Sequence, residues 1–238
     1  YTTHKYFSNP LLRSLPRARS GFDVYQFFSA GAGHININKA RVGQIRKSPK
    51  QSGVLAADRR IVDKALDEIG RWADDGRPNF LYLHFLGPHL PNKPTKHGQK
   101  AVGQDFQFGV ESSQSKRRSK NILRPRRGSP IDHQNYLAAM WDLDKELDRV
   151  FTALEETGLL ESTIVVIASD HGEMMGEYGI AGHGKDSAVY QPVTHVPLIL
   201  RIPGQAPARD QDTLVGLVNI GPTVLDAAGL ASKIPDRW

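Results

Sequence analysis

The sequence predicts a three-layer α/β/α domain built on a mostly parallel sheet. Helical and strand-like segments alternate along the chain, which is typical of folds whose helices cover both faces of a sheet. The strand-like segments are short and apolar on both faces, as buried parallel strands are. With 238 residues and a mass of 26.4 kDa, the chain is long enough for one such domain. We therefore expect a single domain over residues 1–238.

The predicted helices and strands follow from the spacing of apolar residues. Residues 57–75 repeat apolar side chains at helical spacing with charged side chains between them, which predicts a surface helix. Asp132 stands where it can cap a long helix that Gly158 ends. The other expected elements are a strand that contains the first residues of the chain, strands at 80–86, 163–168 and 196–202, and a helix at 222–229.

Composition excludes several classes of protein. No apolar run approaches the roughly 18 to 20 residues that cross a bilayer, so we expect no membrane span. The chain contains no cysteine, which excludes disulfides, thiolate metal sites and a cysteine nucleophile. Neither observation assigns the protein to a cellular compartment.

The net charge of +6 comes from one segment. Seven lysine and arginine residues and no acidic residue lie within residues 116–127, which leaves the remainder of the chain at −1. Because Ser, Pro and Gly surround these charges without apolar periodicity, we predict a basic, flexible insertion at 113–130. The alternative is a surface that binds an acidic polymer. No aromatic residues alternate with the charges to stack bases, so nucleic acid is not the expected partner.

Two predicted strands end in residues that suit metal and acid–base chemistry. Asp170 and His171 come just after the strand at 163–168, and His89 lies between two prolines after the strand at 80–86. Functional residues of open α/β sheets lie beyond the carboxyl ends of the strands. A carboxylate and an imidazole in sequence, followed by a glycine that lets the turn aim both at one ion, suit a divalent cation. Taken alone, each motif equally fits a capping aspartate or an ordinary loop histidine.

Four blocks of sequence strengthen the metal-site interpretation because they occur together and in order. They are residues 78–91, the helix that carries Asp144, residues 163–173 and residues 190–204. In this combination the chain resembles the sulfatase family of the alkaline phosphatase superfamily, over most of residues 1–231. The resemblance implies an alkaline-phosphatase-like fold and a sulfuric ester hydrolase whose substrate is a small-molecule or glycan sulfate ester.

The resemblance also implies roles for individual residues. Asp170 and His171 would be two ligands of one divalent cation, with Ca²⁺ preferred over Mn²⁺ or Zn²⁺. His89 would contact the sulfate or protonate the leaving oxygen. The family usually carries a sulfate-binding lysine or histidine a little further along the chain. Both His183 and Lys185 fit that description, and the spacing does not decide between them.

The chain also departs from the family pattern. Sulfatases carry a Cys- or Ser-x-Pro-x-Arg segment after a strand that ends in two aspartates, and residues 14–19 imitate that segment with their arginines out of place. Residues 1–10 resemble family segments that lie after the nucleophile. We therefore expect a domain that is incomplete at its N-terminus. A formylglycine or serine nucleophile and two carboxylate ligands would lie in the missing part, and this chain alone would have little activity.

Two other functions remain alternatives. One is a phosphodiester or phosphonate monoester hydrolase, or a phosphoglycerol transferase, of the same superfamily. An aspartate–histidine pair suits Mn²⁺ and Zn²⁺ as well as Ca²⁺, so the choice of metal does not distinguish these enzymes. The other is a non-enzymatic relative that binds polyanions through residues 116–127. We further expect an exposed apolar sheet edge and a homo-oligomer.

Overall fold

The computed structural model describes eight stretches of the chain. These are residues 2–8, 22–28, 35–36, 54–89, 92–102, 130–183, 189–207 and 213–235. The predicted basic insertion at 113–130 lies outside them, except for Pro130, which is the first residue of a helix. The single domain over residues 1–238 stays a prediction.

The larger sheet is mostly parallel, as expected. β1 (Thr2–Phe7) pairs in parallel with both β2 (Val24–Phe27) and β4 (Asn79–His84). β3 (Ile35–Asn36) runs antiparallel to β2, so the strand order is β3-β2-β1-β4. The strands predicted at the start of the chain and at 80–86 are therefore confirmed.

The later strands form antiparallel pairs. β5 (Val165–Ala168) pairs with β8 (Leu198–Arg201), and β6 (Met174–Met175) pairs with β7 (Ala181–Gly182). A parallel return from β5 to β8 requires a crossover, usually a long helix. The described part of the connection between β5 and β8 contains only the short β6–β7 hairpin and the four-residue α5 (Gln191–Thr194). The chain therefore folds back, and β8 runs beside β5 in the opposite direction.

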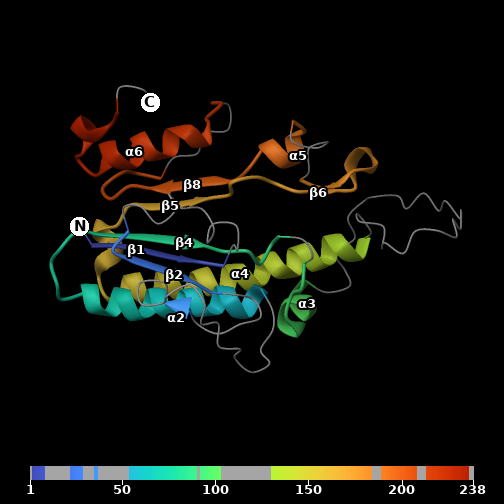
Figure 1. Cartoon of the computed structure of the whole chain (residues 1–238), viewed down its shortest axis with the longest axis horizontal. Coiled ribbons are helices and arrows are strands. Elements are labelled where there is room, and N and C mark those ends of the chain that lie inside the picture. The colour runs from blue at the N-terminus through green and yellow to red at the C-terminus, as the bar shows by residue number, and fades with distance from the viewer. Residues whose placement is uncertain are drawn as a thin grey trace, which may run out of the picture.

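The helices lie on both sides of the strands (Figure 1). α2 (Val54–Trp72) and α4 (Pro130–Glu156) pack together on one side, and α6 (Ile220–Ala227) lies on the other, next to β5 and β8. The short α3 (Lys96–Val102) packs on α4. α4 begins at Pro130, so the prediction that Asp132 caps this helix is wrong. Proline suits the first turn of a helix because that turn leaves its N–H groups unpaired.

Helix α2 connects the sheet to α4 by burying two of its faces. Ile61 packs with Tyr6 of β1, while Val62 and Ile69 pack with Val150 of α4. Full burial of such a side chain contributes about 1.5–3 kcal/mol. The helical spacing predicted for residues 57–75 therefore describes both contact faces of α2.

A buried carboxylate on α2 fastens the ends of two strands. Asp58 is 1% exposed, and its Oδ1 accepts hydrogen bonds from Ser8 Oγ at 3.2 Å and from the Leu86 backbone N–H at 3.1 Å. Ser8 directly follows β1, and Leu86 lies in the loop that carries His89. Burial raises the pKa of Asp58 to about 6, although both hydrogen bonds favour the ionised form.

The loop after β5 packs directly against α5. The Gly172 N–H donates to the Val193 carbonyl oxygen at 2.7 Å. A Cβ atom at position 172 would lie 2.0 Å from the Pro192 carbonyl oxygen, far inside van der Waals contact. Only glycine allows the two backbones to approach this closely.

The exposed surface includes an apolar strand. Leu198, Ile199 and Leu200 of β8 are 38%, 58% and 40% exposed, which agrees with the expected apolar edge. The homo-oligomer stays a prediction. In the part of the chain that the structure describes, no helix has both the length and the apolar character needed to cross a bilayer.

Replacing Asp58 by asparagine should make folding less sensitive to pH. Since burial raises the native pKa of Asp58 from 3.8 to about 6, the native state holds a proton that the unfolded chain releases between about pH 4 and 6. The free energy of unfolding therefore falls by about 2–3 kcal/mol as the pH rises through that window. Urea unfolding at pH 4 and pH 7.5 should show a smaller difference for Asp58→Asn than for the wild type. The exposed Asp148→Asn should keep the wild-type difference, and an equal response of Asp58→Asn would contradict the assignment.

Replacing Gly172 by alanine should destabilise the protein. The added Cβ meets the carbonyl of Pro192, so α5 must move away from the loop, at a cost of about 1–3 kcal/mol. Gly70, on α2, has no atom within 4 Å of its would-be Cβ. Gly70→Ala should therefore stabilise the helix by up to about 1 kcal/mol. Denaturant unfolding of both variants measures the contrast, and a Gly172→Ala protein as stable as the wild type would refute the close packing.

Candidate functional site

Three histidines from separate parts of the chain meet in the folded protein. His89 follows β4, His171 follows β5 and His183 follows β7. The ring centroids of His171 and His183 are 4.1 Å apart, those of His89 and His183 are 4.8 Å apart, and those of His89 and His171 are 6.4 Å apart. The structure thus brings together all three histidines that the sequence analysis selected. Lys185, the alternative to His183, lies outside the described residues.

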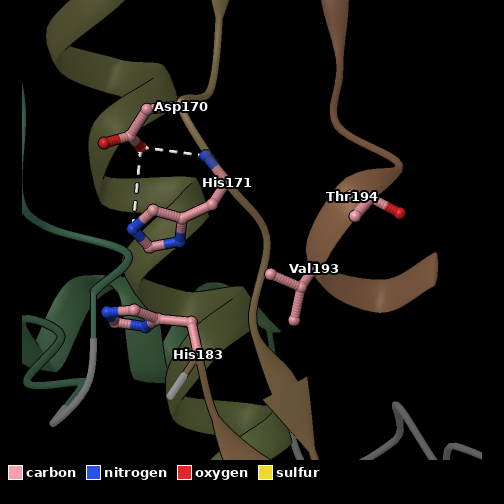
Figure 2. A pocket seen from close by; sticks show the side chains of 5 residues that line it. All are labelled: Asp170, His171, His183, Val193 and Thr194. Atoms are coloured by element: carbon pink, nitrogen blue, oxygen red, sulfur yellow. Dashed lines mark hydrogen bonds and ion pairs between the residues drawn. The ribbon is translucent and has the colours of Figure 1, made fainter. Parts of the chain in front are cut away.

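Asp170 and His171 direct two potential ligand atoms toward one another (Figure 2). Asp170 Oδ1 accepts a hydrogen bond from the His171 backbone N–H at 3.1 Å and lies 3.9 Å from His171 Nε2. His171 Nδ1 donates to the Gly172 carbonyl oxygen at 2.8 Å, because a carbonyl can only accept. In the neutral ring, Nε2 therefore carries the lone pair, on the side of the carboxylate.

This pair fits a divalent cation. Ligand atoms 3.9 Å apart can both reach one ion at the usual distances of about 2.0–2.6 Å. A ligating histidine almost always donates its other ring N–H to a carbonyl or a carboxylate, as His171 does to Gly172. Within the described stretches, no group of three or more His, Cys, Asp or Glu side chains is arranged to hold a metal ion. Asp170 and His171 could supply two ligands of such an ion.

The Asp170 carboxylate affects the pKa values of two residues of β4. Burial, and secondarily the Asp170 carboxylate, raises the pKa of the Tyr82 phenol. Burial lowers the pKa of His84, and Asp170 opposes that effect. The carboxylate at the end of β5 therefore acts electrostatically on residues at the end of β4, where the loop that carries His89 begins.

A second acidic residue holds His183. Both carboxylate oxygens of Glu173 lie close to His183 Nδ1, at 3.0 and 3.2 Å. The Glu173 side chain is 8% exposed, whereas that of Asp170 is 68% exposed. The sequence analysis assigned no role to Glu173, although it is the last residue of the family-like block at 163–173.

A pocket of about 390 Å³ opens beside these residues (Figure 2). Asp170, His171 and His183 line it together with Val193 and Thr194 of α5. The contact between Gly172 and α5 is what brings those two residues to the pocket. Sequence reasoning missed them because a four-residue helix is too short to show a periodicity.

Comparisons with known proteins identify the family of the chain. The chain matches the family model described as Sulfatase over residues 1–230. It is 26% identical over 221 residues to the endo-4-O-sulfatase of Bacteroides thetaiotaomicron, an alignment that covers 92% of this chain and 42% of that relative. The chain spans less than half the length of the first curated relatives that it matches.

Solved structures show the same fold. The protein yidJ of Bacteroides fragilis, described as a sulfatase, superposes with a TM-score of 0.75 at 21% identity and covers 99% of this chain and 54% of that one. A protein solved with its substrate D-glucosamine-2-N,6-O-disulfate has a TM-score of 0.64 at 19% identity, covering 99% of this chain and 60% of that one. The predicted alkaline-phosphatase-like α/β fold is confirmed, and the family match over residues 1–230 leads to one conclusion: the chain belongs to the sulfatase family.

Proposed function

We propose that this site takes part in the metal-dependent hydrolysis of sulfuric esters. The observation that carries the proposal is that a partial metal-ligand pair and the His183 imidazole line one pocket, with the His89 ring 4.8 Å from that of His183. Membership of the sulfatase family implies a divalent metal cofactor. The finer assignment, Ca²⁺ held by Asp170 and His171, is part of the proposal. When bound, such a cation polarises the ester oxygens and stabilises developing negative charge.

His89 and His183 would act on the sulfuryl group. Their rings are 4.8 Å apart and come from different loops, so both can reach one small anion. A sulfuryl group in transfer spreads negative charge over its oxygens, and preorganised N–H donors stabilise that charge. We assign His183, rather than Lys185, to the sulfate because its ring lies 4.1 Å from that of His171. His89 would bind the sulfate or protonate the leaving oxygen.

The proposal assigns no residue of this chain as the nucleophile. The formylglycine or serine that the family resemblance implies has no counterpart among the site residues described above. Ser169 stands next to Asp170, but its hydroxyl donates to the His171 carbonyl oxygen at 2.6 Å and so stabilises the loop. The described residues of this chain would supply metal ligation, anion binding and proton transfer.

Two stacked tyrosines beside the pocket support a sulfated glycan as the substrate. The rings of Tyr178 and Tyr190 are 5.0 Å apart and inclined by 28°, and Tyr190 directly precedes α5. Tyr178 is 78% exposed and has a φ of 55°, a strained value for a residue other than glycine. Such strain concentrates at functional sites. An exposed aromatic face at the rim can pack on a sugar ring, and the relative from B. thetaiotaomicron is named as an endo-4-O-sulfatase.

Mutants should distinguish metal binding by Asp170 from the action of His89 on the sulfate ester. Asp170→Ala removes a charged ligand, so Ca²⁺ affinity should fall by at least about 100-fold and turnover should be lost with it. His89→Ala should leave Ca²⁺ affinity within about twofold and lower turnover by about 10²–10⁴-fold. Calorimetric titration with Ca²⁺ gives the first readout, and hydrolysis of an aryl sulfate by a form of the protein that also contains the nucleophile gives the second. Undiminished Ca²⁺ binding by Asp170→Ala would count against the metal assignment.

The reaction class is tested by substrate competition. A sulfatase should hydrolyse an aryl sulfate faster than an aryl phosphodiester under the same conditions, because its site stabilises the charge of a sulfuryl group. Faster cleavage of the phosphodiester would replace the proposal by its phosphoester alternative. If neither ester is cleaved even by a form of the protein that contains the nucleophile, and heparin binding falls steeply with salt, the polyanion-binding alternative is favoured.

The tyrosine pair should affect glycans but not small anions. Tyr178→Ala removes a stacking face worth about 0.5–1.5 kcal/mol, so the Kd of a sulfated tetrasaccharide should rise about 2- to 12-fold. The Kd of inorganic sulfate should stay the same, because the ring lies outside the five residues that line the pocket. Tyr178→Phe keeps the ring and is the matched control. Equal tetrasaccharide binding by wild type and Tyr178→Ala, measured by calorimetry, would remove the support for a glycan substrate.

A further inference from the structure

The pairing of Glu173 with His183 follows from the backbone of a hairpin. In the antiparallel β6–β7 ladder, Met174 pairs with Gly182 and Met175 pairs with Ala181. One step further along the same register, Glu173 faces His183. Side chains of directly opposed residues project from the same face of a hairpin, with Cβ atoms about 4.5–5.5 Å apart. The register therefore accounts for the two contacts of 3.0 and 3.2 Å.

The surroundings of Glu173 mark it as a residue that acts on His183. In the part of the chain that the structure describes, the ion pair of Glu173 with His183 is the only one it makes. Its side chain is 8% exposed, so it has little contact with water. Burial, and then the charge of Glu173, raises the pKa of Tyr136, which places the carboxylate beside α4. A nearly buried carboxylate needs a strong hydrogen-bond donor, and His183 supplies it.

The two histidines that line the pocket are held in the same way. His171 Nδ1 donates to the Gly172 carbonyl oxygen at 2.8 Å, and His183 Nδ1 donates to the Glu173 carboxylate at 3.0 Å. In both rings the hydrogen bond at Nδ1 leaves Nε2 as the nitrogen available to a ligand. The backbone carbonyl of Gly172 orients the His171 ring. The side chain of Glu173 orients the His183 ring, and mutation can change that side chain.

We propose that Glu173 is a positioning residue for His183. By accepting the Nδ1 proton, it prevents the ring from turning over and directs Nε2 into the pocket. Nδ1 carries the donated proton in the neutral and the charged ring alike, so the orientation holds in both forms. That the directed Nε2 then serves sulfate binding rests on the proposed function, whereas the orientation of the ring does not.

The orientation is tested by NMR on the full chain. Long-range ¹H–¹⁵N spectra at pH 8, where an ordinary histidine is neutral, report which ring nitrogen is protonated, and His183→Asn identifies the His183 signals. The wild type should show a protonated Nδ1. Glu173→Ala should shift the proton toward Nε2, whereas Glu173→Gln should retain the wild-type pattern because its amide oxygen still accepts a hydrogen bond. An unchanged Nδ1 signal in a folded Glu173→Ala protein would overturn the proposal.

A neighbouring residue provides the matched control. Glu177 lies in the same hairpin, and its Oε2 accepts a hydrogen bond from the Met175 backbone N–H at 2.6 Å. Glu177→Gln makes the same change of charge without touching His183 and should leave the ring spectrum unchanged. If Glu177→Gln altered the His183 signals as much as Glu173→Ala does, the effect would belong to the hairpin as a whole and the assignment to Glu173 would fail.

Calorimetry with inorganic sulfate separates this inference from the proposed function. Glu173→Ala should raise the Kd of sulfate about 10-fold, the loss of one well-directed hydrogen bond to a charged group, with Ca²⁺ affinity unchanged. If the ring turns over but sulfate affinity does not change, positioning by Glu173 stands and the role of His183 in sulfate binding falls.

Discussion

The backbone contact between Gly172 and Val193 holds the two sides of the site together. On one side, the loop after β5 carries Asp170 and His171, and on the other, α5 carries Val193 and Thr194. The two segments approach so closely that a single added methyl group would meet a carbonyl oxygen at 2.0 Å. Because interiors are tightly packed and resist deformation, this contact limits how far the loop and α5 can move relative to one another.

The site is organised by hydrogen bonds to ring nitrogens. A carbonyl fixes His171 and a carboxylate fixes His183, so both imidazoles keep Nε2 available for a ligand. Asp58 of α2 anchors the loop that carries His89, because its carboxylate accepts a hydrogen bond from the Leu86 backbone N–H. Asp58 is nearly fully buried, and burial raises its pKa. Anchoring the loop with this carboxylate therefore lowers the stability of the fold.

Much of the site was predictable because its residues follow strands. The apolar runs before Asp170 and before His89 predict β5 and β4, and the carboxyl ends of such strands carry functional residues. The role of Glu173 was not predictable from the sequence. It depends on the register of a hairpin whose strands are two residues long, too short for an alternating pattern. The closeness of the His171 and His183 rings likewise became visible only in the folded structure.

The sequence by itself determined the helices and strands with a clear apolar period, such as α2 and β4, and the family to which the chain belongs. Those features are local or lie in short blocks of residues, so they can be read from consecutive positions. Only the tertiary structure decided that β8 runs antiparallel to β5, and that α5 closes the pocket against Gly172. The direction of a strand and the distance between two backbone segments depend on contacts between residues far apart in the chain. Local propensity carries no information about such contacts.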